Sequence, residues 1–289
     1  MIRLTGRGVI YGELWYDEPA PSAPGVDILQ YRQSPVLIAQ IGHTPFLSLV
    51  SELTPAPDAI IDKFGKDCRY KIRRAQSRDG LQIESIAEPH ARLDEFADFF
   101  DVFATEKSVA LCDRNWLVAA CNARQLALSS VSRDGEALVW HAHVLSGMTA
   151  GLQYSASRFR DRDSDYRALV GRANRWLHWH DMLHFKQTGK DHYDWGGIFA
   201  DESAPDRAGI NNFKRDFGGQ QVRSFQFDVP LTIRGRVWLP LRQAWLRARS
   251  LDGGSRAGVR AIDAAAGQAT QNDAVPGRQA YATGEGSIV

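Results

Sequence analysis

The sequence predicts a mixed α/β (α+β) domain, in which a mixed central sheet is flanked by helices. Amphipathic helical patterns alternate with short strand patterns, and a tight hairpin joins two strands in the middle of the chain. The 289 residues suffice for one large domain or two modest ones. Hydrophobic residues make up 44% and charged residues 24%, which is typical of a globular protein.

Charge and cysteine content narrow the class of function. The formal net charge of +1 argues against dependence on a strong uniform field, but 35 Lys and Arg against 34 acids still allow a local basic patch. Three widely spaced cysteines, without a CxxC pair or a zinc-type cluster, indicate a reduced cytoplasmic setting and no metal. Neither a signal peptide nor a membrane-spanning run of about eighteen apolar residues is expected.

Short strand patterns dominate the first 55 residues, which we expect to form a partial amino-terminal lobe. VIYGELWY is strand-like, and two further strands are predicted over 26–32 and 36–41, with apolar character extending to Val50. Residues 56–250 are expected to form the main domain. The Gly- and Ala-rich segment 251–289 has almost no aromatic residues for a core, which predicts a flexible tail.

A helix predicted over 58–76 opens the main domain and ends in a basic run. Five cations lie in this run and the turn after it: Arg69, Lys71, Arg73, Arg74 and Arg78. Asp67 and Asp79 cannot neutralise all five. The run is therefore either a solvated helix face or a site that binds a polyanion such as phosphate or tRNA.

The middle of the chain predicts helices over 93–106 and 115–128, after a brief strand over 81–86, and capping around Asp113 is expected to begin the second helix. A hairpin follows, with strands over 136–145 and 148–155 joined by Ser146-Gly147.

Alternation places His141 and His143 on one face of the first hairpin strand. A buried structural role and a ligand contact are both compatible with this pattern. A long helix over 168–186 carries three more histidines, but no acidic third ligand stands out, so we expect no metal there.

The chain between His184 and Gln220 predicts the wall of an active site. A strand ends at Tyr193-Asp194-Trp195, a Gly196-Gly197 turn follows, and a short helix carries Phe213-Lys214 before Gly218-Gly219. Glycine pairs lie where the backbone turns sharply or approaches a ligand closely. Strand ends are where α/β proteins usually build their sites. A strand over 222–227 and a basic amphipathic helix over 238–249 complete the pattern.

This order of elements resembles the GNAT acyltransferase fold, and more specifically its Fem-type (FemAB-like) branch. Residues 70–75, YKIRRA, are similar to the basic helix of that branch, and residues 193–197, YDWGG, to its aromatic-Asp-x-Gly-Gly strand end. Residues 213–219, FKRDFGG, resemble its Phe-Lys-x-x-Phe-Gly signature. Fem-type enzymes usually contain two GNAT-like halves, whereas this chain has room for one and a partial amino-terminal lobe.

The resemblance implies transfer of an activated acyl or aminoacyl group to an amine of a small metabolite or cell-envelope precursor. The donor would be aminoacyl-tRNA or acyl-CoA as a co-substrate, with no tightly bound cofactor. Two alternatives stay open: a GNAT N-acetyltransferase that depends on acyl-CoA, and a GNAT-like binding protein without turnover. No Ser/His/Asp or Cys/His nucleophile arrangement is recognisable, so direct attack is expected.

Candidate site residues follow from the resemblance and the strand pattern. Lys214 is expected to stabilise the negative charge that develops on the acyl oxygen. Asp194 either takes up the proton of the attacking amine or binds the backbone amides of the glycine turn, and Tyr154 would donate to the acyl or leaving group. The expected substrate contacts are His141, His143, Tyr193, Trp195 and Phe213, although Tyr193 and Trp195 fit a core role better. Donor phosphates are assigned to Lys71, Arg73 and Arg74.

Overall fold

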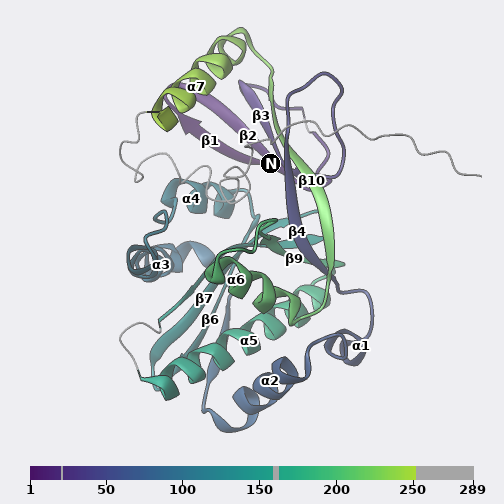
Figure 1. The fold of residues 1–289 in the computed structure, drawn as a ribbon. Coiled ribbons are helices and arrows are strands. Elements are labelled where there is room, and N and C mark those ends of the chain that lie inside the picture. The colour runs from purple at the N-terminus through teal and green to yellow at the C-terminus, as the bar shows by residue number, and fades with distance from the viewer. Residues whose placement is uncertain (21, 159–162, 252–289) are drawn as a thin grey trace, which may run out of the picture.

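The computed structural model describes residues 1–20, 22–158 and 163–251 (Figure 1). Its strands are β1 (Ile2–Gly6), β2 (Val9–Trp15), β3 (Ile28–Ser34), β4 (Thr44–Glu52), β5 (Gln82–Ile86), β6 (Leu126–Arg133), β7 (Glu136–Ser146), β8 (Thr149–Ser157), β9 (His192–Gly197) and β10 (Gln220–Pro230). Its helices are α1 (Pro57–Ile61), α2 (Lys66–Arg78), α3 (Leu93–Lys107), α4 (Arg114–Asn122), α5 (Ser164–Gln187), α6 (Pro205–Arg215) and α7 (Ile233–Leu251), and a 3-10 turn spans Pro89–Arg92.

All ten strands belong to one mixed sheet, in the order β1-β2-β3-β10-β4-β9-β8-β7-β6-β5. Two neighbouring pairs are parallel, β2 with β3 and β8 with β9, and the other pairs are antiparallel. The predicted mixed α/β class is therefore confirmed. The strands of the first 55 residues pair within this sheet, and β4 lies between β10 and β9.

Helices cover both faces of the sheet (Figure 1). On one face, α2 and α5 pack against β4 and β9 through a cluster that includes Ile72, Met182 and Trp195. On the other face, α3 and α4 pack against β6, β7 and β8 through a cluster that includes Phe96, Trp116 and Trp140. Because alternate residues of a strand face opposite sides, each central strand contributes to both layers.

Side-chain caps begin two of the described helices, α4 and α5. The Asp113 side chain accepts a hydrogen bond from the Trp116 amide at 3.0 Å and so caps α4, as the sequence predicts. In the same way, Asp163 caps α5 by accepting from the Tyr166 amide at 2.8 Å. The Ser146-Gly147 hairpin between β7 and β8 is also confirmed, with Gly147 at φ 51°.

Three expected elements differ from the structure. Residues 36–41 form no strand, and the strand lies at β4 instead; Val36 is 66% exposed, so this apolar run contributes little to the core. The helix expected over 58–76 is two helices, α1 and α2, separated by the turn at Gly65. The helix expected over 115–128 ends at Asn122, because Arg124 adopts φ 57° and β6 begins at Leu126.

Strand β1 was not predicted, and most of the tail predicted over 251–289 lies outside the described residues. No helix within the described ranges is long and apolar enough to cross a membrane.

Gly218, which follows α6, holds the end of that helix against the turn between α1 and α2. Its φ is +66°, and an added Cβ would lie 2.9 Å from the carbonyl oxygen of Lys63. In Gly218→Ala, the alanine would have to adopt a strained left-handed φ, and its Cβ would overlap the Lys63 backbone. We therefore expect this variant to lower the free energy of unfolding by about 1–3 kcal/mol in chemical denaturation.

Gly209→Ala is the matched control. Gly209 lies within α6 and has no atom within 4 Å of an added Cβ. Alanine is favoured over glycine by about 1 kcal/mol in a helix, so this variant should be at least as stable as wild type. Equal stability of the two variants would contradict the role assigned to Gly218.

Candidate active site

Asp194 lies where the parallel ladder between β8 and β9 ends. Three residue pairs form this ladder, and the last joins Gly151 to Asp194. The side chain is 1% exposed and accepts a hydrogen bond from the Gly196 amide at 2.7 Å. The carboxylate thus binds a backbone amide of the glycine pair, which was one expected alternative, but the expected turn is wrong: Gly196 and Gly197 lie within β9, at an irregularity of its pairing with β4.

Lys214 reaches the same strand end from α6. Its Nζ donates to the carbonyl oxygen of Gly197 at 2.6 Å, and the side chain is turned inward rather than to bulk water. Burial lowers the pKa of the Lys214 ammonium from 10.5 to about 8, and the charge of Asp194 opposes this shift. Burial raises the pKa of Asp194 from 3.8 to about 6, while the Gly196 amide and Lys214 lower it.

The structure adds Tyr16 and Ser48 to this pair. The Tyr16 hydroxyl is buried, lacks a hydrogen-bond partner of normal geometry among the described residues, and lies close enough to Asp194 to lower the pKa of the carboxyl. The Ser48 hydroxyl, from β4, acts on Asp194 in the same direction. Tyr16 follows β2 at φ 57°, a conformation that costs a non-glycine residue about 1–3 kcal/mol.

Gly151 makes room for Tyr16. A Cβ at residue 151 would lie 1.7 Å from the Tyr16 hydroxyl, so β8 tolerates the ring only because it has glycine there. No local pattern in the sequence pointed to Tyr16 or Ser48, because each reaches Asp194 only through pairing of strands distant in the chain.

Arg175 of α5 fixes the part of α6 that carries Lys214. Its guanidinium lies 4.8 Å from the centroid of the Phe213 ring, and Nη2 donates to the Asp216 carboxylate at 3.2 Å. Phe213 also packs against the Phe217 ring, which belongs to the α2–α5 core. These contacts on both sides of Lys214 restrict the position of its ammonium.

His141 lies in a fully buried polar cluster beneath α5. Its Nδ1 is 2.7 Å from Oδ2 of Asp181, and its Nε2 is 2.8 Å from Oδ1 of Asn174. Donor atoms of His141, His178 and Asp181 all lie within 4.8 Å of one another. However, both ring nitrogens of His141 are engaged by Asp181 and Asn174, and Nδ1 of His178 lies 2.8 Å from the Tyr193 hydroxyl. The geometry favours a hydrogen-bonded core over a metal centre.

His143 and Tyr193 belong to the same polar core. The Tyr193 hydroxyl bridges His143 Nε2 at 2.9 Å and His178 Nδ1 at 2.8 Å. Burial lowers the pKa of both histidines, to about 3 for His143, and raises that of Tyr193, so the three groups are uncharged near neutral pH.

Trp195 completes this layer, and its Nε1 donates to Ser51 Oγ at 2.9 Å. Because Asp194 alternates with Tyr193 and Trp195, it faces the opposite side of the sheet. Tyr193 and Trp195 therefore have the core role that was expected. His141 and His143 lie on the same face of the sheet as these two aromatics, and not beside the Asp194 carboxylate.

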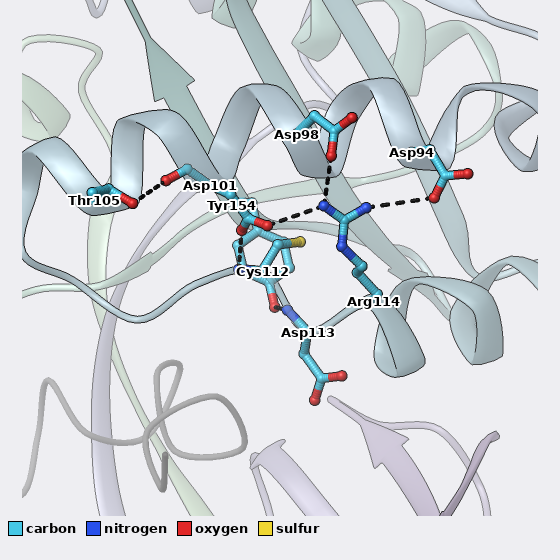
Figure 2. Close-up of polar contacts among 8 residues, drawn as sticks. All are labelled: Asp94, Asp98, Asp101, Thr105, Cys112, Asp113, Arg114 and Tyr154. Atoms are coloured by element: carbon cyan, nitrogen blue, oxygen red, sulfur yellow. Dashed lines mark hydrogen bonds and ion pairs between the residues drawn. The ribbon is translucent and has the colours of Figure 1, made fainter. Parts of the chain in front are cut away.

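Tyr154 lies in the other apolar layer, beneath α3 and α4. Its ring packs against Phe100 with centroids 4.8 Å apart, and its hydroxyl accepts from the Asp113 amide at 3.4 Å. Figure 2 shows this contact beside Arg114, which pairs with a row of α3 carboxylates: Asp94, Asp98 and Asp101. Burial raises the pKa of Tyr154. No hydrogen bond joins Tyr154 to Lys214 or Asp194 within the described ranges, so the structure does not bring this expected catalytic residue to the pair.

The basic run of α2 divides into three environments. Lys71 pairs with Asp67 at 2.6 Å, and Arg73 is exposed on the helix surface. Arg74 lines a groove of about 640 Å³ between α2, β6 and α5. The charged residues of this groove are Arg74, Arg78, Arg133, Arg172, Asp79, Asp163 and Asp165. Four arginines against three aspartates make it only weakly positive.

The chain was compared with known proteins by sequence and by fold. No family model matches the sequence, and no curated protein matches it. Among solved structures, FemX superposes with a TM-score of 0.52 at 16% identity, over 64% of this chain and 61% of FemX. The C-terminal domain of a putative lysylphosphatidylglycerol synthetase from Agrobacterium fabrum superposes with a TM-score of 0.51 at 16% identity, over 81% of this chain and 76% of that domain.

At such low identity these likenesses define the fold alone. The chain has a GNAT-like fold, with a large mixed sheet flanked by helices. The resemblance to the Fem-type branch indicated by the sequence motifs is confirmed as a likeness of fold to FemX. The match spans less than two thirds of FemX.

The depressed pKa of Lys214 predicts a pH-dependent stability. Between pH 8 and 10.5 the unfolded chain binds more protons at this residue than the folded chain, so the free energy of unfolding rises with pH. Relative to Lys214→Met, wild type should gain stability across this window, by at most about 3 kcal/mol. Denaturation at a series of pH values measures the difference, and Lys66→Met controls for the loss of an exposed lysine. If the difference in free energy of unfolding between wild type and Lys214→Met did not change with pH, the burial of the ammonium would be contradicted.

Proposed function

We propose that this chain is an N-acyltransferase or aminoacyltransferase that moves an activated acyl group to an amine by direct attack. One observation carries the proposal. The Lys214 ammonium points into the protein and donates to the Gly197 carbonyl, close enough to Asp194 at the end of the parallel ladder for the two charges to interact. A fixed cation in a partly buried site stabilises the oxyanion of acyl transfer far more than it would in water.

The reaction divides between these two residues. The amine nitrogen attacks the acyl carbon, the oxygen gains negative charge, and Lys214 stabilises that charge. Asp194 accepts the proton released by the nitrogen as the new C–N bond forms. The bond to the donor's oxygen or sulfur then breaks, and the leaving group takes up the proton that Asp194 accepted, which restores the carboxylate. Because the pKa of Asp194 is about 6, its carboxylate is ionised and able to accept this proton at neutral pH.

Donor phosphates fit the groove that Arg74 lines. Asp79 is already engaged there by Arg172, whose Nη2 lies 3.1 Å from its carboxylate, whereas Arg78 has no ion pair among the described residues. The small positive excess suits a few phosphates rather than a long backbone. Acyl-CoA and aminoacyl-tRNA could both place phosphates in this groove, since each carries phosphates at a distance from the reactive carbonyl.

Lys214→Ala tests the proposal. We expect it to lower kcat about 10²–10³-fold with little change in KM, because the lost interaction forms mainly in the transition state. Purified protein is incubated with labelled aminoacyl-tRNA or acyl-CoA and a panel of amines, and donor loss is measured. Lys190→Ala, which removes a contact to the Gly147 carbonyl on another turn, is the matched control.

The donor assay also separates the remaining alternatives. Turnover with acyl-CoA alone would identify the acetyltransferase-like variant, and turnover with charged tRNA the aminoacyl variant. Undiminished turnover in Lys214→Ala would exclude the role given to this residue, and binding of neither donor would favour a protein without turnover.

The pKa values predict a bell-shaped profile of kcat/KM. Activity should rise as pH increases through about 6, where Asp194 loses its proton, and fall above about 8, where Lys214 does. The two limbs belong to the interacting pair. Asp194→Asn should abolish the acidic limb and lower the maximum. A profile that keeps its acidic limb in Asp194→Asn would show that another group is the proton acceptor.

A further inference from the structure

Helix α7 presents an apolar stripe to solvent that the proposed reaction does not use. Ile233, Val237 and Leu241 follow each other at intervals of four residues and are 81%, 58% and 57% exposed. Residues four apart lie on one face of a helix, so these side chains form a continuous outer row. Exposed aliphatic residues scattered singly need no explanation, but a row of this kind marks an interaction surface.

The opposite face of α7 is firmly attached to the body of the protein. Gly235 packs against the backbone of Asp27, because a Cβ there would lie 2.2 Å from the Asp27 carbonyl oxygen. Trp238 donates from Nε1 to the Tyr11 hydroxyl, and Arg242 pairs with Asp228 at 2.9 Å. The helix therefore holds a fixed orientation beside β1, β2 and β3 (Figure 1). The exposed fractions of Ile233, Val237 and Leu241 show that the stripe faces solvent.

The charge of α7 is entirely positive. Between Ile233 and Leu251 the sequence has five arginines and no acidic residue. Arg234 and Arg236 are exposed beside the stripe. Arg234 lies 3.7 Å from the Asp27 carboxylate, and no ion pair of Arg236 is seen within the described ranges. An apolar row bordered by arginines is typical of helices that lie in the plane of a membrane interface and are attracted to anionic lipids.

We propose that α7 docks this protein on an anionic lipid surface, with Ile233, Val237 and Leu241 inserted among the acyl chains and Arg234 and Arg236 at the headgroups. The exposed aliphatic row favours lipid over RNA, because RNA requires the cations but does not bury aliphatic side chains. The concentration of arginine favours lipid over a second copy of the same helix, because two copies would bring like charges together. This inference is independent of the transfer reaction.

Vesicle binding tests the proposal on the full chain. Flotation is measured with vesicles of phosphatidylcholine alone and with vesicles containing about one third phosphatidylglycerol, at about 0.1 M salt. We expect binding to the anionic vesicles to be at least tenfold stronger than to the neutral ones, and to weaken when salt is raised to about 0.5 M. The double variant Val237→Ser/Leu241→Ser should weaken binding to anionic vesicles at least tenfold.

The matched control is Val102→Ser/Val118→Ser, which removes two exposed valines from α3 and α4 and should bind as wild type does. Thermal denaturation verifies that both double variants remain folded. The proposal is overturned if wild type does not bind anionic vesicles, binds neutral ones equally, or is unaffected by the α7 substitutions. It is also overturned if wild type is a dimer that the α7 substitutions dissociate, or if RNA rather than lipid is bound through Arg236.

Discussion

The arrangement of the site depends on placing two opposite charges, Asp194 and Lys214, in a largely buried position without direct ion-pair contact. Burial disfavours both charges, which is why the pKa of Asp194 rises and that of Lys214 falls. Each charge is compensated by the backbone of one glycine pair: the Gly196 amide donates to Asp194, and the Gly197 carbonyl accepts from Lys214. The two charges thus stay apart, and each is positioned to interact with a reacting group.

The remainder of the fold positions this pair. Strand β9 delivers Asp194 to one face, while Tyr193 and Trp195 anchor the strand in the α2–α5 core on the other face. The Tyr193 hydroxyl ties β9 to β7 and α5 through His143 and His178, and Asp181 holds His141 in the same layer. The buried histidines thus support the strand that carries the site. Buried polar networks of this kind stabilise one arrangement because an unpaired member is costly.

The sequence was most informative where local chemistry decides the structure. The hairpin at Ser146-Gly147 and the cap at Asp113 follow from short patterns, and the structure has both. The turn expected at Gly196-Gly197 was wrong, because pairing with β4 extends β9 through Gly197. The core role of Tyr193 followed from strand alternation alone. The strand expected over 36–41 was wrong because a run of apolar residues does not reveal whether tertiary packing will cover it. Tyr16, Ser48 and Gly151 could not be predicted, since they meet Asp194 only after strands from distant parts of the chain pair.

The most direct test of this account is the titration of the Lys214 ammonium by NMR, with labelled lysine and Lys214→Arg to assign the signal. The expected pKa is about 8, and it should fall further in Asp194→Asn because the neighbouring negative charge is lost. A value near 10.5 that does not respond to Asp194→Asn would show that Lys214 is solvated and remote from Asp194, and would contradict the site described for this fold.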